Sequence, residues 1–472
     1  MPTIKIIDPV TRIEGHMSVE VTIDNGRVVD AYCTGTLFRG FETILSGRDA
    51  WDAPVITQRI CGVCPVSHAT ASVLALESIG AKTVPDNARI LRNLTLGANF
   101  IQSHILHFYF LAARDYIKLL NAAPWAPAWD VDMRIPATDP VNGHLPQAIE
   151  ARRRAHEMGA IFGGRMPMAH TFIPGGFTAV PSQQSIDQYL AQLDWLIGFI
   201  RSVYVPDVQA IGAVYSDYFS IGGGDRNLFA FGAFDLDAGG TQKLFARGYV
   251  ENGRTGAPAA LNLNDISESV TYSWYSDSTN NLHPSAGSTA PQNPKGSAYS
   301  WLKAPRYMGK PFEAGPLARM WINGDYQRGI SVMDRHMARA NETLKVAEAM
   351  RGWLGSLRIG SPVYADGSVT SGSGVGLTEA ARGALGHWVL ASSGKISRYQ
   401  VITPTCWNAS PRDSQNIPGP MEKALIGITV ADENQPVEVL RVIHSYDPCL
   451  ACAVHVIKPK SRARIVSVKP RY

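Results

Sequence analysis

Two Cys-x-x-Cys pairs stand near opposite ends of this chain of 472 residues. The pairs are Cys61 with Cys64 and Cys449 with Cys452. One such pair is a weak signal, because zinc sites, redox dithiols and iron–sulfur clusters all use this spacing. Two pairs so far apart can share one site only if the fold returns the end of the chain to its beginning.

The composition favours a metal or redox protein with a large core. Apolar residues make up 45% of the chain, and its six cysteines, four of them in the two pairs, are not a disulfide framework. The formal charge of +4 comes without a sustained basic stripe, so no nucleic-acid partner is expected. No apolar run reaches the ~18 residues of a membrane span, and we expect no signal peptide in the chain.

Hydrophobic periodicity predicts a mainly helical α+β fold. Alternating apolar residues predict a hairpin at 17–33 and a second one at 387–403. Pro65 opens a helical pattern, which places Cys61 and Cys64 at a helix N-terminus, where thiolate charge is favoured. Further helices are predicted at 86–111, 146–162, 182–204 and 328–354.

We expect residues 1–455 to form one large unit, a long helix bundle with small peripheral sheets, because no linker is long enough to free two domains. Its expected regions are an N-terminal β-hairpin region (1–45), a helical core (62–204 and 328–385), a loop-rich insertion (205–325) and a C-terminal hairpin and metal-ligand segment (387–455). A tail with six basic residues and no acidic one follows at 456–472.

Four converging thiolates could hold a structural zinc ion, an iron–sulfur cluster or a binuclear centre of softer metals. A structural zinc site usually closes a small local module. The pairs here have neighbours suited to proton transfer and charge control, namely Arg59, His68, Asp447 and His455, with Glu14 available from the opening segment. These neighbours favour a reactive metal centre over a structural one.

Other candidate ligands are interpreted as core residues. His104 and His107 lie three residues apart in an otherwise apolar helical pattern, where hydrogen-bonded core histidines are commoner than metal ligands. Cys33 and Cys406 are expected to be small buried residues rather than further ligands.

Motifs along the whole chain resemble those of a known family. They are DPVTRIEGH (8–16), FRGFE (38–42), RICGVCPVSH (59–68), HFY (107–109), GGRMP (163–167), FEAGPLAR (312–319), ARGALGHW (381–388), TCWNASPRD (405–413) and DPCLACAVH (447–455). The chain resembles, almost from end to end, the large catalytic subunit of nickel–iron hydrogenases of the respiratory uptake type. The resemblance implies reversible heterolytic cleavage of dihydrogen into protons and electrons.

The resemblance also implies a nickel–iron centre whose iron carries carbon monoxide and cyanide. Cys64 and Cys452 would bridge the two metals, and Cys61 and Cys449 would be terminal ligands of nickel. Thiolates suit soft, low-valent metals, so this ligand set agrees with the chemistry of the residues.

The remaining residues implied by the resemblance act on protons and on the cofactor. Cys449 would accept the proton, and Glu14 would carry it onward, because burial can raise a carboxyl pKa toward the working range. Arg382 would lie over the open metal position as a fixed cation. The residues expected to bind or support the cofactor are His68, beside the bridging Cys64, with Pro404, Thr405 and Asp447.

A second metal ion is implied near the C-terminus. Glu42 and His455, with a backbone carbonyl near 400–403, match ligands of a magnesium ion, or iron in some members, and oxygen ligands suit magnesium. In the family an endopeptidase cuts after the residue matching His455. Residues 456–472 are therefore expected to be a maturation peptide, with a permanent basic tail as the alternative.

The remaining cysteines are too few for a further four-thiolate cluster, so a small iron–sulfur partner subunit is expected to carry the electrons. It would pass them to a membrane cytochrome or another carrier, and would bring this chain to the periplasm or the membrane. The rival interpretations are a related subunit of ion-pumping machinery that has lost the metals, and a structural zinc or nickel-binding scaffold.

Three residues depart from the common family pattern. Ser103 stands where many members have aspartate, Ala381 replaces a proline before the arginine, and Cys406 occupies a position that is commonly threonine. None of these changes removes a metal ligand.

Overall fold

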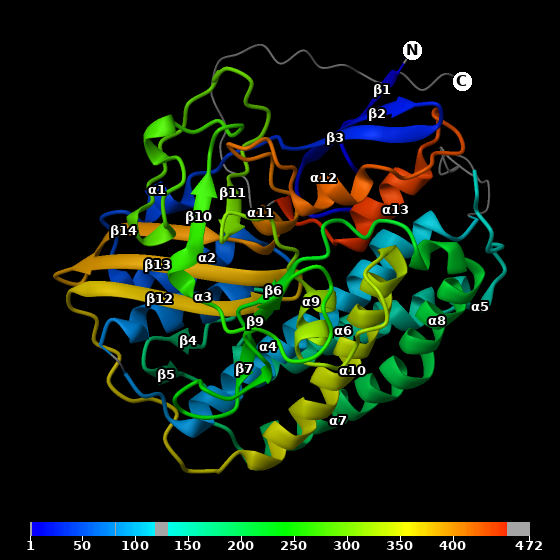
Figure 1. The fold of residues 1–472 in the computed structure, drawn as a ribbon. Coiled ribbons are helices and arrows are strands. Elements are labelled where there is room, and N and C mark those ends of the chain that lie inside the picture. The colour runs from blue at the N-terminus through cyan, green and yellow to red at the C-terminus, as the bar shows by residue number, and fades with distance from the viewer. Residues whose placement is uncertain (1, 81, 119–130, 451–472) are drawn as a thin grey trace, which may run out of the picture.

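Long helices form a bundle on one side of the molecule. One three-stranded sheet lies on the opposite side of the molecule, and another lies at the top of the view in Figure 1. The computed structural model describes residues 2–80, 82–118 and 131–450. The helices are α1 (Phe41–Leu45), α2 (Ala53–Thr57), α3 (Pro65–Ser78), α4 (Asp86–Leu106), α5 (Pro140–Gly143), α6 (Leu145–Gly163), α7 (Gln183–Phe199), α8 (Val205–Val214), α9 (Pro316–Ile322), α10 (Val332–Ser356), α11 (Pro404–Asn408), α12 (Pro420–Leu425) and α13 (Val437–Ser445).

Within these described ranges the strands pair into small antiparallel sheets, two with three strands and four with two. They are β1 (Thr3–Ile7), β2 (Met17–Asp24), β3 (Arg27–Gly35), β4 (Phe172–Ile173), β5 (Gly176–Phe177), β6 (Leu228–Ala230), β7 (Ala233–Asp235), β8 (Lys243–Phe245), β9 (Gly248–Val250), β10 (Ile266–Ser269), β11 (Ala304–Tyr307), β12 (Gly372–Ala380), β13 (Gly383–Ser392) and β14 (Lys395–Ile402). Together with the helices they confirm the predicted α+β class.

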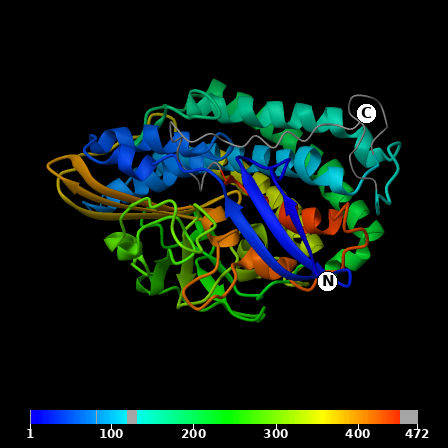
Figure 2. The same ribbon diagram turned by 90° about the horizontal axis from the view of Figure 1, so that it is seen from above.

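The N-terminal sheet follows directly from its sequence pattern. In β2 the apolar residues of the alternating pattern are buried and the polar ones between them are partly exposed. Asn25 and Gly26 both have positive φ, which matches a two-residue hairpin turn into β3. Viewed from above, this blue sheet crosses in front of the helices (Figure 2).

The sheet β12–β13–β14 packs against α3 through glycine. An ideal Cβ built on Gly376 would lie 1.9 Å from the backbone oxygen of Ala71, and one on Gly374 would lie 2.0 Å from that of Ala75. Only glycine permits this approach of strand to helix. The contact fixes α3, and therefore the two cysteines before it, relative to the sheet.

The prediction of a helical core at 328–385 is wrong for the end of this range. Residues 372–380 and 383–385 are strand, because the glycine-rich run in β12 weakens a helix and pairs with β13 against α3. The helix expected at 328–354 is α10, at Val332–Ser356. The predicted hairpin at 387–403 is confirmed by β13 and β14.

One predicted helix runs further than expected, and another has the predicted length. The helix predicted at 182–204 continues through a π-helical turn into α8, at the start of the expected loop-rich insertion. Pro206 lies in the first turn of α8, directly after this π-helical turn. The predicted helix at 86–111 corresponds to α4 with the π-helical turn His107–Ala112.

The main hydrophobic core contains residues from Val10 to Leu450, so both ends of the described chain are packed into it. Helices α4, α6, α7 and α10 contact one another within this core. In the part of the chain that the structure describes, no helix combines the length and the apolar character needed to cross a membrane.

Candidate metal centre

The end of the described chain is paired with its beginning. Glu14 and Cys449 form a parallel β-bridge, in which the N–H of Leu450 donates to the carbonyl of Glu14 at 2.6 Å. The N–H of Cys449 also donates to the Thr405 hydroxyl at 2.9 Å. These bonds bring the second cysteine segment to the first.

Three cysteine sulfurs meet as a result. The Sγ atoms of Cys61, Cys64 and Cys449 lie within 4.8 Å of one another, and those of Cys61 and Cys449 are 3.3 Å apart. All three side chains are buried. The fourth predicted ligand, Cys452, lies outside the described residues.

The backbone around the first pair favours thiolate charge. The N–H groups of Val63 and Cys64 point at the Cys61 sulfur, at 3.3 and 3.2 Å. Cys64 is the N-cap residue of α3, so the positive end of that helix dipole also faces the cluster.

Arg382 is buried beside the cluster in the two-residue turn between β12 and β13. Its Nη2 atom lies 3.0 Å from Asp447 Oδ1, and its Nη1 atom donates to Ser103 Oγ at 3.3 Å. Burial opposes the charge, but Asp447 and the three cysteines outweigh it and raise the pKa of Arg382. A permanent cation therefore stands against the thiols.

The Glu14 carboxyl lies near the first cysteine pair, with Oε1 3.8 Å from an ideal Cβ built on Gly62. Burial raises the pKa of its carboxyl, and the Cys61 charge adds to this, while Arg382 and Arg39 act in the opposite direction. A carboxyl of this kind can hold and release a proton nearer neutral pH than an exposed one.

The chain as a whole is similar to known proteins. The model of the nickel-dependent hydrogenase family matches residues 39–143 and 140–455, and the model of a HoxL-like family matches residues 4–34. The chain belongs to the nickel-dependent hydrogenase family. It is a large, catalytic hydrogenase subunit, an oxidoreductase that acts on dihydrogen.

Relatives and solved structures agree. The chain is 41% identical to the periplasmic [NiFeSe] hydrogenase large subunit of Desulfomicrobium baculatum, over 96% of this chain and 94% of that one. It is 32% identical to the hydrogenase-2 large chain of Escherichia coli strain K12, over 98% and 99% of the two chains. A structure of the Ni-Fe-Se hydrogenase from D. vulgaris Hildenborough superposes with a TM-score of 0.92 at 42% identity, covering 96% of this chain and all of that one. The predicted family and fold are thus confirmed.

The donor set of this hydrogenase subunit fits a nickel–iron centre. Three soft sulfur ligands converge in a buried pocket, with a guanidinium and backbone N–H groups placed to balance their charge. The name of the Desulfomicrobium relative includes selenium, whereas the four candidate ligands here are cysteines.

His68 follows Cys64 by one helical turn on α3 and is fully buried. Its Nδ1 atom lies 3.2 Å from Nε2 of His387, and burial lowers the pKa of His68 to about 4. The sequence motif contained His387, but no pattern indicated that it would contact His68.

Pro404 and Thr405 open the short helix α11, whose first turn faces the C-terminal cysteine segment through the Thr405 hydroxyl. Proline suits this position because its fixed φ is already helical. Thr405 is buried, and it is the residue of this pair that touches Cys449.

Glu42 on α1 lies beside the segment predicted to complete a second metal site. Its Oε1 atom accepts from the N–H of Val401 at 2.9 Å, and its other oxygen accepts from the Thr289 hydroxyl. The predicted partner His455 lies outside the described residues. The ammonium of the neighbouring Lys303 lies 3.2 Å from Glu268 and donates to Gln400. No sequence pattern indicates this residue, because these contacts join distant segments.

The remaining histidines and cysteines that were considered are in the core. His107 Nε2 lies 2.6 Å from the backbone oxygen of His444, and His104 Nε2 lies 3.6 Å from Glu342. Cys33 and Cys406 are buried, and neither belongs to the cluster of three sulfurs.

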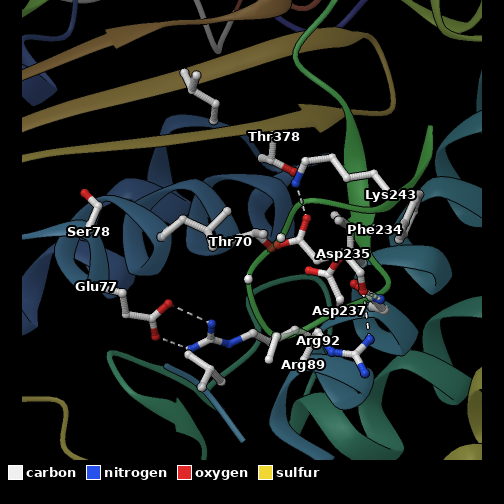
Figure 3. A pocket seen from close by; sticks show the side chains of 18 of the residues that line it. Thr70, Glu77, Ser78, Arg89, Arg92, Phe234, Asp235, Asp237, Lys243 and Thr378 are labelled. Atoms are coloured by element: carbon white, nitrogen blue, oxygen red, sulfur yellow. Dashed lines mark hydrogen bonds and ion pairs between the residues drawn. The ribbon is translucent and has the colours of Figure 1, made fainter. Parts of the chain in front are cut away.

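A cavity of about 400 Å³ lies elsewhere, between α3, α4, the β7–β8 hairpin and β12 (Figure 3). Its charged side chains are mostly paired with one another, as Arg92 with Glu77 and Lys243 with Asp235. None of the predicted site residues that the structure describes lines it. This cavity is separate from the metal centre.

Proposed function

We propose that this hydrogenase subunit cleaves dihydrogen at a nickel–iron centre held by Cys61, Cys64, Cys449 and Cys452, with carbon monoxide and cyanide on the iron. The observation that carries the proposal is the meeting of three of these sulfurs, from opposite ends of the chain, beside a buried arginine. When bound, the centre supplies a site where dihydrogen is polarised and gives up two electrons.

Cys449 and Glu14 move the proton. The Cys449 sulfur accepts it, and the Glu14 carboxyl takes it onward, since the β-bridge holds the two residues side by side. The raised pKa of Glu14 suits this role, because a donor and acceptor group works best when its pKa is near the working pH.

Arg382 supplies a fixed positive charge to the reacting molecule. Its guanidinium is held by Asp447 and Ser103, so little reorganisation is needed during the reaction. Asp447 thus acts on the cofactor through the position of Arg382.

Pro404 and Thr405 orient the iron ligands. The Thr405 oxygen already accepts from Cys449, which leaves the hydroxyl proton for a cyanide. The first backbone N–H groups of α11 add donors of the same kind.

A magnesium ion, or iron, bound by Glu42 and His455 would pin the C-terminus near Val401. The closeness of Glu42 to Val401 supports this site. We further propose that an endopeptidase removes residues 456–472 after His455, so that the ligand segment closes only in the mature enzyme.

The family implies a small subunit in a heterodimer, and the small subunit would carry the iron–sulfur clusters. Among the described residues the two other cysteines, Cys33 and Cys406, lie outside the sulfur cluster, so they offer no electron route. We propose that electrons continue to a membrane cytochrome or another carrier, and that the complex is periplasmic or membrane-attached. The name of the Desulfomicrobium relative describes that protein as periplasmic.

The test is to purify the two-subunit complex and measure metals, infrared spectra and dye-coupled dihydrogen uptake together. We expect nickel and iron in near-equal amounts, infrared bands of metal-bound carbon monoxide and cyanide, and uptake activity. Zinc without those bands would instead support a structural scaffold and overturn the proposed centre.

A further inference from the structure

The loop between Cys61 and Cys64 is held from outside by helix α4. Asn99 and Gln102 lie three residues apart, and therefore on one face of α4, and both donate their side-chain amides to the backbone oxygen of Val63, each at 2.9 Å. Both side chains are buried. The two amides thus occupy both lone pairs of a carbonyl that lies between the cysteines of the first pair.

That carbonyl belongs to the same peptide unit as the N–H of Cys64. The unit is planar and trans, so its carbonyl and its N–H point in opposite directions. Holding the Val63 oxygen against α4 therefore aims the N–H of Cys64 away from α4, and its nitrogen lies 3.2 Å from the Cys61 sulfur. The direction of one carbonyl thus fixes a hydrogen bond to sulfur on the other side of the peptide.

A histidine on α6 determines which end of the Gln102 amide faces the loop. The oxygen of Val63 can only accept, so Gln102 presents its NH2 group to it and its Oε1 to Nε2 of His156, which lies 3.2 Å away. Burial and the nearby Arg152 lower the pKa of His156 to about 4, so the ring is neutral and carries one proton. Because Oε1 can only accept, that proton lies on Nε2.

We propose that Asn99 and Gln102 are positioning residues, which hold the Val63 carbonyl so that the Cys64 N–H donates to the sulfur of Cys61. The inference rests on the proposed function, in which Cys61 is a ligand of nickel. The two amides, and the imidazole that orients one of them, come from parts of α4 and α6 outside the motifs that carry the family resemblance.

The hydrogen bond from Cys64 changes what the Cys61 sulfur gives to its metal. A thiolate that accepts a hydrogen bond donates less electron density, and hydrogen bonds to sulfur are one of the ways a protein sets metal potentials. Without the two amides, the buried Val63 carbonyl loses its donors and the peptide unit turns toward another partner. The sulfur then donates more strongly to nickel, which stabilises the oxidised metal and lowers its reduction potential.

The decisive variant replaces both amides by apolar side chains of similar size, Asn99→Leu together with Gln102→Met, in the complete two-subunit enzyme. We expect a lower midpoint potential of nickel, followed by electron paramagnetic resonance. Turnover should fall about 10-fold to 100-fold, as is typical for loss of residues that support metal ligands. Each single variant keeps one donor and should lower the potential by less.

Hydrogen–deuterium exchange of the backbone amides at 62–64 tests the loop itself. Because the N–H of Cys64 loses its acceptor, we expect exchange in this segment to be about tenfold faster in the double variant. This measurement does not depend on nickel. A failure of the proposed centre would be recognised separately, by the absence of nickel from the unmutated enzyme.

Asn93→Leu is the matched control, because Asn93 is a buried amide on the same helix and donates to the Asp235 carbonyl at 2.8 Å. It should leave the nickel potential and the exchange at 62–64 unchanged. His156→Phe removes the group that orients the Gln102 amide, so it should lower the potential by up to as much as Gln102→Met does.

An unchanged nickel potential in the double variant would overturn the inference, as would a shift in Asn93→Leu of the same size as that in the double variant. If the double variant takes up no metal, the two single variants and His156→Phe carry the test. An unchanged potential in all three of them would overturn the inference as well.

Discussion

The two halves of the metal centre are held in different ways. Cys61 and Cys64 stand at the start of α3, which is locked to β12 by backbone contacts that only glycine allows. In the C-terminal segment, hydrogen bonds to Glu14 and Thr405 hold Cys449, and the neighbouring Leu450 packs into the main core. The first half is fixed by backbone contact between a helix and a strand and can form before metal arrives, whereas the second lies at the end of the described chain and can dock last, as the proposed maturation requires.

The largest expected effect comes from breaking the packed half. Gly376→Ala places a methyl group where an ideal Cβ lies 1.9 Å from a backbone oxygen, so α3 and β12 must separate. We expect destabilisation of about 3 kcal/mol or more and little soluble protein, since overpacking a rigid contact is costly. Thermal unfolding and yield of the two-subunit complex measure this.

Gly352→Ala is the control for that variant. Gly352 lies within α10, and a Cβ there meets no heavy atom within 4 Å. Replacing glycine by alanine in a helix should stabilise it by about 0.5–1 kcal/mol. Equal stability of the two variants would contradict the view that the α3–β12 contact anchors the first half.

How much of this difference the sequence predicts depends on whether the interactions are local or join segments that are distant in the chain. The β2–β3 hairpin and α3 follow from local periodicity and from Pro65. The strands at 372–385 could not be predicted, because the glycines there make sense only against a helix about 300 residues earlier in the chain.

The site shows the same division. The cysteine pairs are visible as motifs, and the family resemblance indicated roles for Glu14 and Arg382. Contacts such as Arg382 with Asp447, or Tyr399 with His387, join segments that are distant in sequence, so no spacing rule reveals them.

The next largest effect separates the two parts of Glu14, whose backbone holds the second half while its carboxyl is proposed to move protons. Glu14→Gln keeps the β-bridge and removes the titrating group. We expect nickel and iron content to stay the same, and turnover and hydrogen–deuterium exchange to fall at least about 100-fold, as is typical for loss of a general acid or base.

Glu20→Gln serves as the control, since Glu20 lies on β2, in a strand whose polar residues are only partly buried. It should leave exchange and metal content unchanged. Wild-type exchange rates in Glu14→Gln would show that the proton leaves the cluster by another group.

A further effect, on stability, concerns the contact between the N-terminal sheet and α12. Burial raises the pKa of Glu422 to about 7, although the N–H of Cys33 and the Tyr299 hydroxyl donate to it. Because the folded pKa lies above the unfolded one, the stability that this group contributes is complete below about pH 4.5 and is lost as the pH rises through about 7.

The expected loss from Glu422 is about 3 kcal/mol between these limits. Unfolding by urea at pH 5 and pH 8 measures it, and Glu422→Gln should flatten the difference. An equally steep pH dependence in that variant would assign it to other groups, of which Glu379 is the first candidate, because burial raises its pKa to about 7 as well.

The smallest effect tests how weakly the second half is held. Thr405→Val removes the acceptor of the Cys449 N–H and leaves that buried group unpaired, which should cost about 1–3 kcal/mol. Because the bond holds Cys449 near the end of the chain and not the contact of α3 with β12, we expect the cost to appear as weaker nickel retention during dialysis against a chelator, with the melting temperature changed by only a few degrees. Thr95→Val is the control, since the Thr95 hydroxyl donates to a helix carbonyl on α4. Equal nickel loss in both variants, or a collapse of the melting temperature in Thr405→Val alone, would mean that the C-terminal half is part of the rigid core, and the contrast between the two halves would not stand.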